Sequence, residues 1–376
     1  MVTYSFDNKD ARQKANLLVN EYRYRGIPVT ALRHLYIPGD INTRVADVDI
    51  LCFAREFLSA SRFDLVHLAH GMRLGSIANA AQESNVPTLY TITDFWTLCP
   101  KINLQTSGGA LCGGPNGGAE CSRFCAELDR SFVQCRLGKI KDMLTRANAI
   151  ATPSRFVRSI LRAELGDIKV QVIPHGIARP QMLPLPKAYR ANNKLVFGYA
   201  GGLAPHKGVH ILLAAFRRLN GEAELRVYGD DTENSGYVNL LRKVAKADPR
   251  IRFCGAYTDD QVDSVFSELD VLVVPSLCYE TYSFSAHEAL AHSVPVIASR
   301  LGSLVDTIQE GINGFTVRAG DVEDLANQLQ QITDHSERLN DLRAKLDDSV
   351  PPMVEEEAYI YQRLYNEITK DVNRQT

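Results

Sequence analysis

The chain has 376 residues, 45% of them hydrophobic and 23% charged, with a formal net charge of −2 at pH 7. This length predicts about two globular domains, and the near-neutral charge argues against nucleic acid as a partner. Asp7 and Asp10 stand where a signal peptide would be cationic, and no run approaches the ~20 apolar residues of a membrane span, so we expect a cytoplasmic protein.

Short apolar runs recur along the chain, with amphipathic stretches between most of them. In the first half we expect strands at residues 2–6, 28–35, 63–68, 88–92, 149–152 and 170–173. In the second half we expect strands at residues 195–200, 223–228, 250–254, 271–274, 294–298 and 314–317. Strands that alternate with helices in this way predict α/β architecture, with parallel, doubly wound sheets.

A stretch without helix or strand periodicity separates the two halves. Residues 176–193 contain Pro180, Pro184 and Pro186, so we expect a linker there and a domain boundary near residue 180. The predicted domains are therefore residues 1–180 and 181–352. Two prolines at 351 and 352 then interrupt the chain, and residues 353–376 contain a terminal amphipathic helix.

Residues 97–135 form an insertion in the first domain that is rich in cysteine and glycine and shows no regular period. A stretch of this length without secondary structure is usually functional or disordered, and we favour a function. Four thiolates, from Cys99, Cys112, Cys121 and Cys125, would suit a structural zinc ion. Buried or free thiols, and disulfide or iron–sulfur chemistry, remain alternatives.

Two glutamates follow the strand expected at residues 271–274. Glu280 ends the loop after that strand, and Glu288 lies in a helix that begins near Ser283. Backbone N–H groups at a helix start hold phosphate groups without a metal, and nearby carboxylates accept hydrogen bonds from sugar hydroxyls. Two solvated glutamates, eight positions apart in the sequence, are the alternative.

A glycine turn follows the strand expected at residues 195–200. Gly201 and Gly202 permit close approach of a ligand to the backbone, and Lys207 can neutralise a leaving phosphate. The spacing fits neither a Rossmann dinucleotide fingerprint nor a Walker loop. Taken alone, the turn could simply cap a strand.

Together these segments resemble glycosyltransferase family 4. The resemblance rests on Glu280 and Glu288 with seven residues between them, on the Lys207-Gly208 pair, and on residues 172–177 and 294–298. It implies the GT-B fold, in which two Rossmann-like domains with doubly wound parallel sheets face each other across a cleft. It also implies a retaining hexosyltransferase that uses a nucleotide diphosphate sugar, UDP-sugar being favoured, and needs no metal for catalysis.

The resemblance assigns roles to individual residues of the second domain. Glu280 is expected to contact hydroxyl groups of the donor sugar, Glu288 the ribose, and Lys207 the diphosphate. The backbone of Phe284 and Ser285, after Ser283, is expected to contact phosphate or sugar. Family members commonly carry Arg where Gly202 stands, so either Lys207 and backbone amides alone hold the diphosphate here or another arginine substitutes.

The first domain supplies acceptor-side candidates. Thr93 stands where relatives often place a histidine, so Asp94 or the leaving phosphate oxygen would take the acceptor proton. His70 follows the strand at residues 63–68, at the sheet edge where ligands bind, or it bonds only to a carbonyl group. Arg12 either reaches the ligand or is an exposed charge in the first turn of a helix.

The expected acceptor is a glycan or a lipid-linked molecule in bacterial surface polysaccharide synthesis, which rests on analogy. Residues 120–169 carry ten Lys or Arg against six Asp or Glu, which indicates either a solvated helix face or peripheral contact with the inner face of a membrane. The alternatives in function are a sugar-nucleotide epimerase of the same fold and a catalytically degenerate nucleotide-binding protein.

Overall fold

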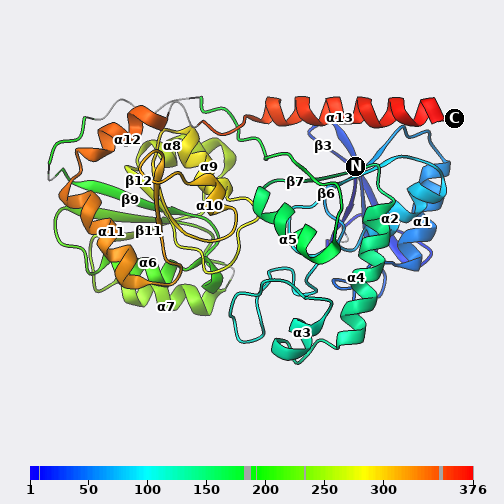
Figure 1. Ribbon diagram of the computed structural model, residues 1–376, viewed down its shortest axis with the longest axis horizontal. Helices are drawn as coiled ribbons and strands as arrows, with labels where there is room; N and C mark the ends of the chain where they lie inside the picture. The colour runs from blue at the N-terminus through cyan, green and yellow to red at the C-terminus, as the bar shows by residue number, and fades with distance from the viewer. Residues whose placement is uncertain (8, 182–187, 192, 233, 347–349, 376) are drawn as a thin grey trace. The chain divides into compact units, whose positions relative to one another are not determined.

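The computed structural model describes residues 1–7, 9–181, 188–191, 193–232, 234–346 and 350–375 (Figure 1). Its contacts divide the chain into two compact units. Unit 1 comprises Met1–Pro153, Val157–Ile173 and Ile360–Thr376, and unit 2 comprises Ser154–Phe156 and Pro174–Tyr359. Of the predicted linker, residues 182–187 and 192 lie outside the described residues.

Unit 2 is built on one parallel sheet. Its strands are β9 Leu195–Ala200, β10 Ala223–Tyr228, β11 Ile251–Gly255, β12 Val271–Val274, β13 Val296–Ser299 and β14 Gly314–Val317. Their order in the sheet is β11-β10-β9-β12-β13-β14, and every neighbouring pair is parallel. The order therefore reverses between β9 and β12, which is the switch point where ligands bind in open α/β sheets.

Helices cover both faces of this sheet (Figure 1). They are α6 Val209–Phe216, α7 Ser235–Ala245, α8 Val262–Ser267, α9 Phe284–Ala291, α10 Leu304–Thr307, α11 Val322–Asp334 and α12 Arg338–Leu346. Side chains alternate along β9: Phe197 and Tyr199 join one apolar cluster with α6 and α11, and Ala200 joins a second with α8 and α9. Burial on both faces explains why these strands read as continuous apolar runs.

Unit 1 contains a second parallel sheet, in the order β5-β6-β7-β8. Its strands are β5 Val66–Leu68, β6 Thr88–Thr91, β7 Ala149–Thr152 and β8 Gln171–Val172, and its helices are α1 Val48–Ser59, α2 Gly75–Glu83, α3 Ala119–Phe124, α4 Arg130–Thr145 and α5 Arg155–Leu165. The last helix, α13 Val354–Gln375, begins in unit 2 and ends in unit 1. Within unit 1, Tyr361, Leu364 and Ile368 of α13 pack against this sheet at Leu89 and Ala151.

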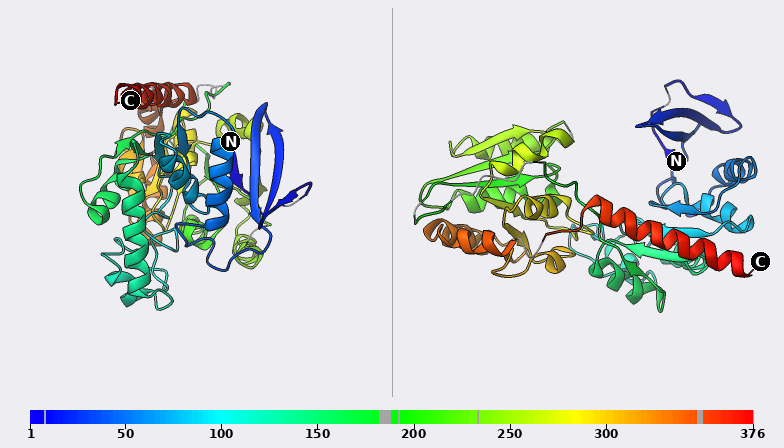
Figure 2. Two further views of the ribbon diagram at one scale, coloured as in Figure 1. Left: turned by 90° about the vertical axis from the view of Figure 1, so that its right-hand side faces the viewer. Right: turned by 90° about the horizontal axis from the view of Figure 1, so that it is seen from above.

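A third sheet, shown in dark blue in Figure 2, was not predicted in full. It has the order β1-β4-β3-β2, with β1 Val2–Tyr4, β2 Arg12–Lys14, β3 Leu17–Tyr24 and β4 Ile27–His34. The antiparallel pair β3–β4 turns at Arg25 and Gly26, whose positive φ values of 48° and 81° suit a two-residue hairpin. Arg12 consequently lies in a strand, and its expected place in a helical turn is wrong.

The cysteine-rich insertion holds more regular structure than its sequence suggests. It contains α3, the start of α4 and an antiparallel bridge between Gln105 and Leu111. The rest of the segment consists of turns and irregular chain. Of the helices in the described part of the chain, none combines the length and apolar character needed to cross a membrane.

Candidate active site

Two loops meet at the switch point of the unit 2 sheet. One follows β9 and leads through a short 3₁₀ turn, Pro205–Lys207, into α6, and the other follows β12 and leads into α9. A cavity of about 300 Å³ lies between these loops. The structure brings to this cavity every residue expected to hold or activate the donor: Gly201, Gly202, Lys207, Glu280, Ser283, Phe284, Ser285 and Glu288.

An ion pair joins the two loops inside the cavity. Lys207 Nζ lies 2.8 Å from Glu280 Oε1, and the Ser276 hydroxyl donates to the same oxygen at 2.6 Å. The Glu280 side chain is 12% exposed and Lys207 is 31% exposed, so the pair is only partly screened by water. An ammonium group has three donors, which leaves two for a ligand. The sequence reasoning missed Ser276, although it lies in the same segment as Glu280.

Gly208 explains how Lys207 is held in place. Its φ of +74° is left-handed, and a Cβ at this position would lie 1.9 Å from the carbonyl oxygen of Pro275. The backbones of the two loops therefore touch, and the Leu277 N–H donates to the His206 carbonyl at 2.8 Å. Only glycine permits this approach, which fixes the lysine beside the glutamate.

The start of α9 forms the other wall of the cavity. Ser283 caps the helix by accepting from the Ala286 N–H, while Phe284 and Ser285 occupy the first turn. Unpaired N–H groups and the helix dipole make such a turn attractive to phosphate. One turn later, burial raises the pKa of Glu288, because the site disfavours its charged carboxylate.

His287 anchors the same helix turn from inside. Its Nδ1–H donates to the Ser283 carbonyl at 2.7 Å, and its ring stacks on Tyr282 with centroids 3.9 Å apart. Burial lowers the pKa of His287 to about 4, because the site disfavours the charged imidazolium. The neutral imidazole thus helps to hold the first turn of α9.

This burial predicts an acid-dependent loss of stability in unit 2. In the unfolded chain His287 titrates near pH 6.5, so its contribution is complete above that pH and disappears as the pH falls towards 4, a change of about 3 kcal/mol. We expect His287→Gln to flatten this slope in denaturation series from pH 7 to 4. The matched control His335→Gln, at an exposed histidine, should keep the wild-type slope. Equal slopes for all three proteins would contradict the prediction.

The parallel sheet of unit 1 places a second polar pair at its carboxyl edge. His70 follows β5 and Asp94 follows the neighbouring strand β6, and the His70 Nε2 atom lies 2.6 Å from Asp94 Oδ2. The side chains are 41% and 27% exposed. Thr93 lies beside them and its hydroxyl donates to the Ala69 carbonyl at 3.4 Å.

His67 of β5 and the candidate Arg12 make contacts of their own. His67 is bonded to the hydroxyl groups of Tyr365 and Thr91, each at 2.7 Å, so it connects α13 to the sheet. Arg12 pairs with Glu21 of the adjacent strand at 2.8 Å and is 71% exposed. The structure therefore does not bring Arg12 to the His70–Asp94 pair as part of one local cluster.

The single tryptophan, Trp96, holds Asp94 in place through a backbone hydrogen bond. Its backbone N–H donates to Asp94 Oδ1 at 2.9 Å, and its buried indole N–H donates to the Asn42 carbonyl at 2.8 Å. The Arg136 guanidinium lies over the indole ring, 4.8 Å from its centroid. Burial lowers the pKa of Arg136 to about 10, and because the side chain is buried it is not part of a basic surface.

The cysteines of residues 97–135 are thiols in the structure. Among the described residues, which include all eight cysteines, none forms a disulfide. Cys99, Cys121 and Cys125 are buried and Cys112 is half-buried. Burial raises the pKa of Cys99 and Cys112, and that of Cys121 to about 12. These values suit neither a free thiolate nor a catalytic nucleophile.

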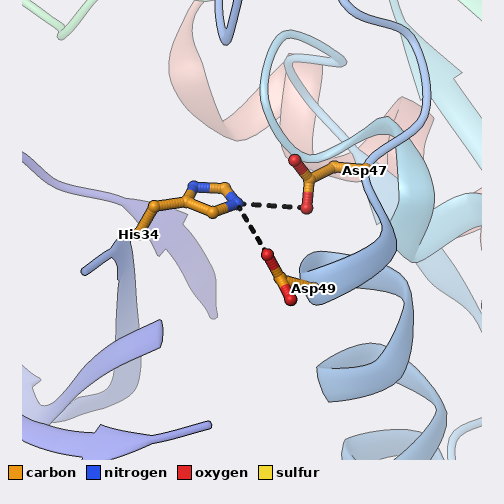
Figure 3. A group of neighbouring side chains, drawn as sticks. All are labelled: His34, Asp47 and Asp49. Atoms are coloured by element: carbon orange, nitrogen blue, oxygen red, sulfur yellow. Dashed lines mark hydrogen bonds and ion pairs between the residues drawn. The ribbon is translucent and has the colours of Figure 1, made fainter. Parts of the chain in front are cut away.

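His34, Asp47 and Asp49 also lie together (Figure 3). The His34 Nε2 atom is 3.1 Å from Asp47 Oδ1 and 3.9 Å from Asp49 Oδ2. However, Arg44 donates to the other Asp47 oxygen at 2.7 Å, and Asp47 caps α1 by accepting from the Ile50 N–H. A guanidinium at this position disfavours a metal cation, so the group is a structural network. The residues are too far apart in sequence to have predicted it.

Two larger cavities, of about 420 and 540 Å³, lie in unit 1. None of the predicted site residues lines either of them. The first runs beside α4 and β7, and the second lies near Arg44, Phe132 and Lys139. The smaller cavity of unit 2 remains the candidate active site, because it combines a glycine turn, a helix start and a partly buried ion pair at a switch point.

Comparisons with known proteins match the part of the chain that lines this cavity. Residues 194–335 match a family model described as Glycosyl transferases group 1. The chain is 28% identical over 181 residues to lipopolysaccharide 1,2-N-acetylglucosaminetransferase of Salmonella typhimurium, which covers 44% of this chain and 48% of that protein. It is 27% identical over 205 residues to 2-deoxystreptamine glucosyltransferase of Streptomyces kanamyceticus, covering 51% and 52%. The chain thus spans about half the length of these relatives.

Solved structures resemble the chain over both units. Sucrose-phosphate synthase of Thermosynechococcus elongatus has a TM-score of 0.71 at 18% identity, covering 98% of this chain and 89% of that one. Anabaena HepE, in complex with UDP and glucose, has a TM-score of 0.66 at 19% identity, covering 90% and 86%. At such identities the likeness concerns the fold.

Proposed function

Since the chain belongs to the glycosyl transferases group 1 family through residues 194–335 and has the GT-B fold, we propose that it transfers a hexosyl group from a nucleotide diphosphate sugar with retention of configuration. The observation that carries this proposal is the cavity at the switch point of unit 2, where Lys207, Glu280 and the start of α9 converge.

We propose that the diphosphate binds between the glycine turn and the start of α9. Backbone N–H groups at Gly202, Phe284 and Ser285 would meet its oxygens, and Lys207 would offset its charge. Glu288, at the buried end of the cavity, would accept from the ribose hydroxyls. UDP is the favoured carrier, because Anabaena HepE, of the same fold, was solved with UDP and glucose.

Catalysis would then depend on charge that develops on the leaving phosphate. Lys207 is already fixed beside Glu280, so its ammonium group needs no reorganisation to stabilise that charge. Glu280 would keep Lys207 in position and accept from a sugar hydroxyl with its second oxygen. No step of this reaction requires a metal.

In unit 1, the His70–Asp94 pair is our candidate for receiving the acceptor proton. Asp94 orients the imidazole through the 2.6 Å hydrogen bond, as a carboxylate orients a general base. Relatives often have a histidine where this chain has Thr93. Here the imidazole would instead come from His70, at the end of the neighbouring strand β5. The leaving phosphate oxygen is the alternative proton acceptor.

For the acceptor we propose a glycan or lipid-linked molecule in bacterial surface polysaccharide synthesis. A lipopolysaccharide transferase among the relatives supports this class, whereas a 2-deoxystreptamine transferase shows that acceptors vary. Exposed basic residues near α4 would provide peripheral contact with the inner face of the membrane for a cytoplasmic enzyme: Arg123, Arg130, Lys139, Lys141 and Arg146.

A thermal-shift and donor-hydrolysis screen over UDP-, GDP- and ADP-sugars, without added metal, tests the proposal. We expect one nucleotide series to raise the melting temperature and its sugar to be released slowly. His70→Asn should leave nucleotide binding unchanged and lower transfer to an acceptor. Isomerised donor without free sugar would indicate the epimerase, and tight binding without turnover on any acceptor would indicate a degenerate binding protein.

A further inference from the structure

Backbone hydrogen bonds of the insertion bring two of its cysteines to the same residue. The Leu104 N–H points to the Cys99 sulfur, and the Leu104 carbonyl accepts from the Cys112 N–H at 2.8 Å. Leu104 itself is buried. Cys99 and Cys112 therefore flank one short segment of chain although twelve residues separate them in sequence.

The other two cysteines lie at the end of α3. The Cys125 N–H donates to the Cys121 carbonyl at 2.8 Å, so both sulfurs belong to one helical turn. The Ser107 N–H donates to the Phe124 carbonyl at 3.1 Å, which joins this turn to the segment that carries Cys99 and Cys112. Electrostatic interactions accordingly link every pair among Cys99, Cys112, Cys121 and Cys125.

The backbone between Cys99 and Cys112 adopts an uncommon conformation. The Ile102 N–H donates to the Cys99 carbonyl at 2.9 Å, and the Cys112 thiol donates to the Gly114 carbonyl at 3.4 Å. Ile102 has a φ of 74° and Leu104 one of 48°, which is rare for these residue types. Such backbone conformations persist only where the surrounding structure fixes them.

We propose that Cys99, Cys112, Cys121 and Cys125 together bind one structural Zn²⁺ ion. Tetrahedral thiolate coordination is the usual arrangement of structural zinc, with Zn–S distances of about 2.3 Å. The thiols lose their protons on binding, and the dication offsets the resulting charge in a buried position. The site lies in unit 1, so it does not depend on the donor assignment in unit 2.

Binding requires the sulfurs to move closer together than they lie in the structure. Among the described residues, only His34, Asp47 and Asp49 bring three ligand atoms within 4.8 Å of one another. Sulfurs around one zinc ion lie about 3.8 Å apart, as the tetrahedral geometry dictates. Rotation of cysteine side chains on a backbone already folded around them supplies this change, whereas a disulfide would use only two of the four.

Zinc would also stabilise the segment that carries Asp94. The Cys99 N–H donates to the Phe95 carbonyl at 2.7 Å, and the Trp96 N–H donates to Asp94. Cys99 and Asp94 are therefore at opposite ends of one tight turn. The ion would anchor this turn in a region that has little regular secondary structure of its own.

Metal analysis of the purified full chain, expressed with zinc and dialysed without it, tests the proposal. We expect about one zinc per chain in the wild type, and less than a fifth of that in Cys112→Ser and Cys121→Ser. Cys135→Ser, at an exposed cysteine outside the set, is the matched control and should retain the wild-type content. Replacement by Co²⁺ should give the visible spectrum of a tetrahedral thiolate complex.

A second variant separates loss of metal from loss of folding. Cys112→His offers zinc another ligand, so it should restore binding where Cys112→Ser does not. Circular dichroism and gel filtration report whether each variant is folded. The proposal is overturned if the folded wild type contains no zinc. It is also overturned if Cys135→Ser loses as much zinc as Cys112→Ser and Cys121→Ser. Thiol titration that finds disulfides among the four cysteines overturns it as well.

Discussion

Lys207→Met is expected to lower kcat for glycosyl transfer by about 100- to 1,000-fold, the usual effect of removing one preorganised charge donor from a transition state. Lys207 is held at 2.8 Å from Glu280 and faces the cavity in which the diphosphate would bind. Its charge counts most when the leaving phosphate becomes more negative, so kcat should fall more than KM rises.

Initial rates over donor concentration measure this effect, with Lys246→Met as control, because Lys246 is an exposed lysine of the same unit. The control should stay within a factor of two of the wild type. Lys207→Met leaves the Glu280 carboxylate without its cation, so Lys207→Met/Glu280→Gln should be folded at least as well as the single variant. Wild-type kcat in the single variant would remove Lys207 from the mechanism.

Gly208→Ala is expected to destabilise the switch-point loops by about 3 kcal/mol or more. A left-handed φ alone costs a non-glycine residue about 1–3 kcal/mol. The new Cβ would in addition lie 1.9 Å from the Pro275 carbonyl oxygen, so one of the two loops must move away. That movement separates Lys207 from Glu280, and donor binding should weaken together with stability.

Hydrogen exchange, measured by mass spectrometry on peptides from β9 and α6, reports the local loss of stability. About 3 kcal/mol corresponds to exchange roughly a hundredfold faster in those peptides. Gly202→Ala is the matched control: a Cβ there meets nothing within 4 Å among the described residues, so exchange in the same peptides should be unchanged. Unchanged exchange in Gly208→Ala would show that the loops do not depend on this contact.

Most strands of the parallel sheets could be predicted from the sequence, because buried strands are short apolar runs that are recognisable locally. The run at residues 271–274 coincides with β12, which is buried along its whole length, and the run at residues 314–317 coincides with β14. That the residues expected to bind the donor lie together could be predicted for a related reason. Loops at the carboxyl ends of β9 and β12 are neighbours in the sheet, so Lys207 and Glu280 meet although 73 residues separate them.

What could not be predicted depends on pairing between distant segments. The β3–β4 hairpin was missed because its outer face carries Tyr22 and Tyr24, which are exposed and blur the alternation of apolar and polar residues. The hydrogen bond between His70 and Asp94 depends on the register of β5 against β6, which no local pattern encodes. The cysteines were visible in the sequence, but the backbone that surrounds Cys99 was not.

The position of Trp96 gives the protein an internal optical probe. It is the only tryptophan, it is 1% exposed, and it lies in unit 1 between Asp94 and Cys99. Excitation at the red edge of the aromatic band, where only tryptophan absorbs, therefore reports on unit 1 alone. The indole that emits lies beside the Arg136 guanidinium. Emission from this one indole separates events near the His70–Asp94 pair of unit 1 from events at the unit 2 cavity, without any label.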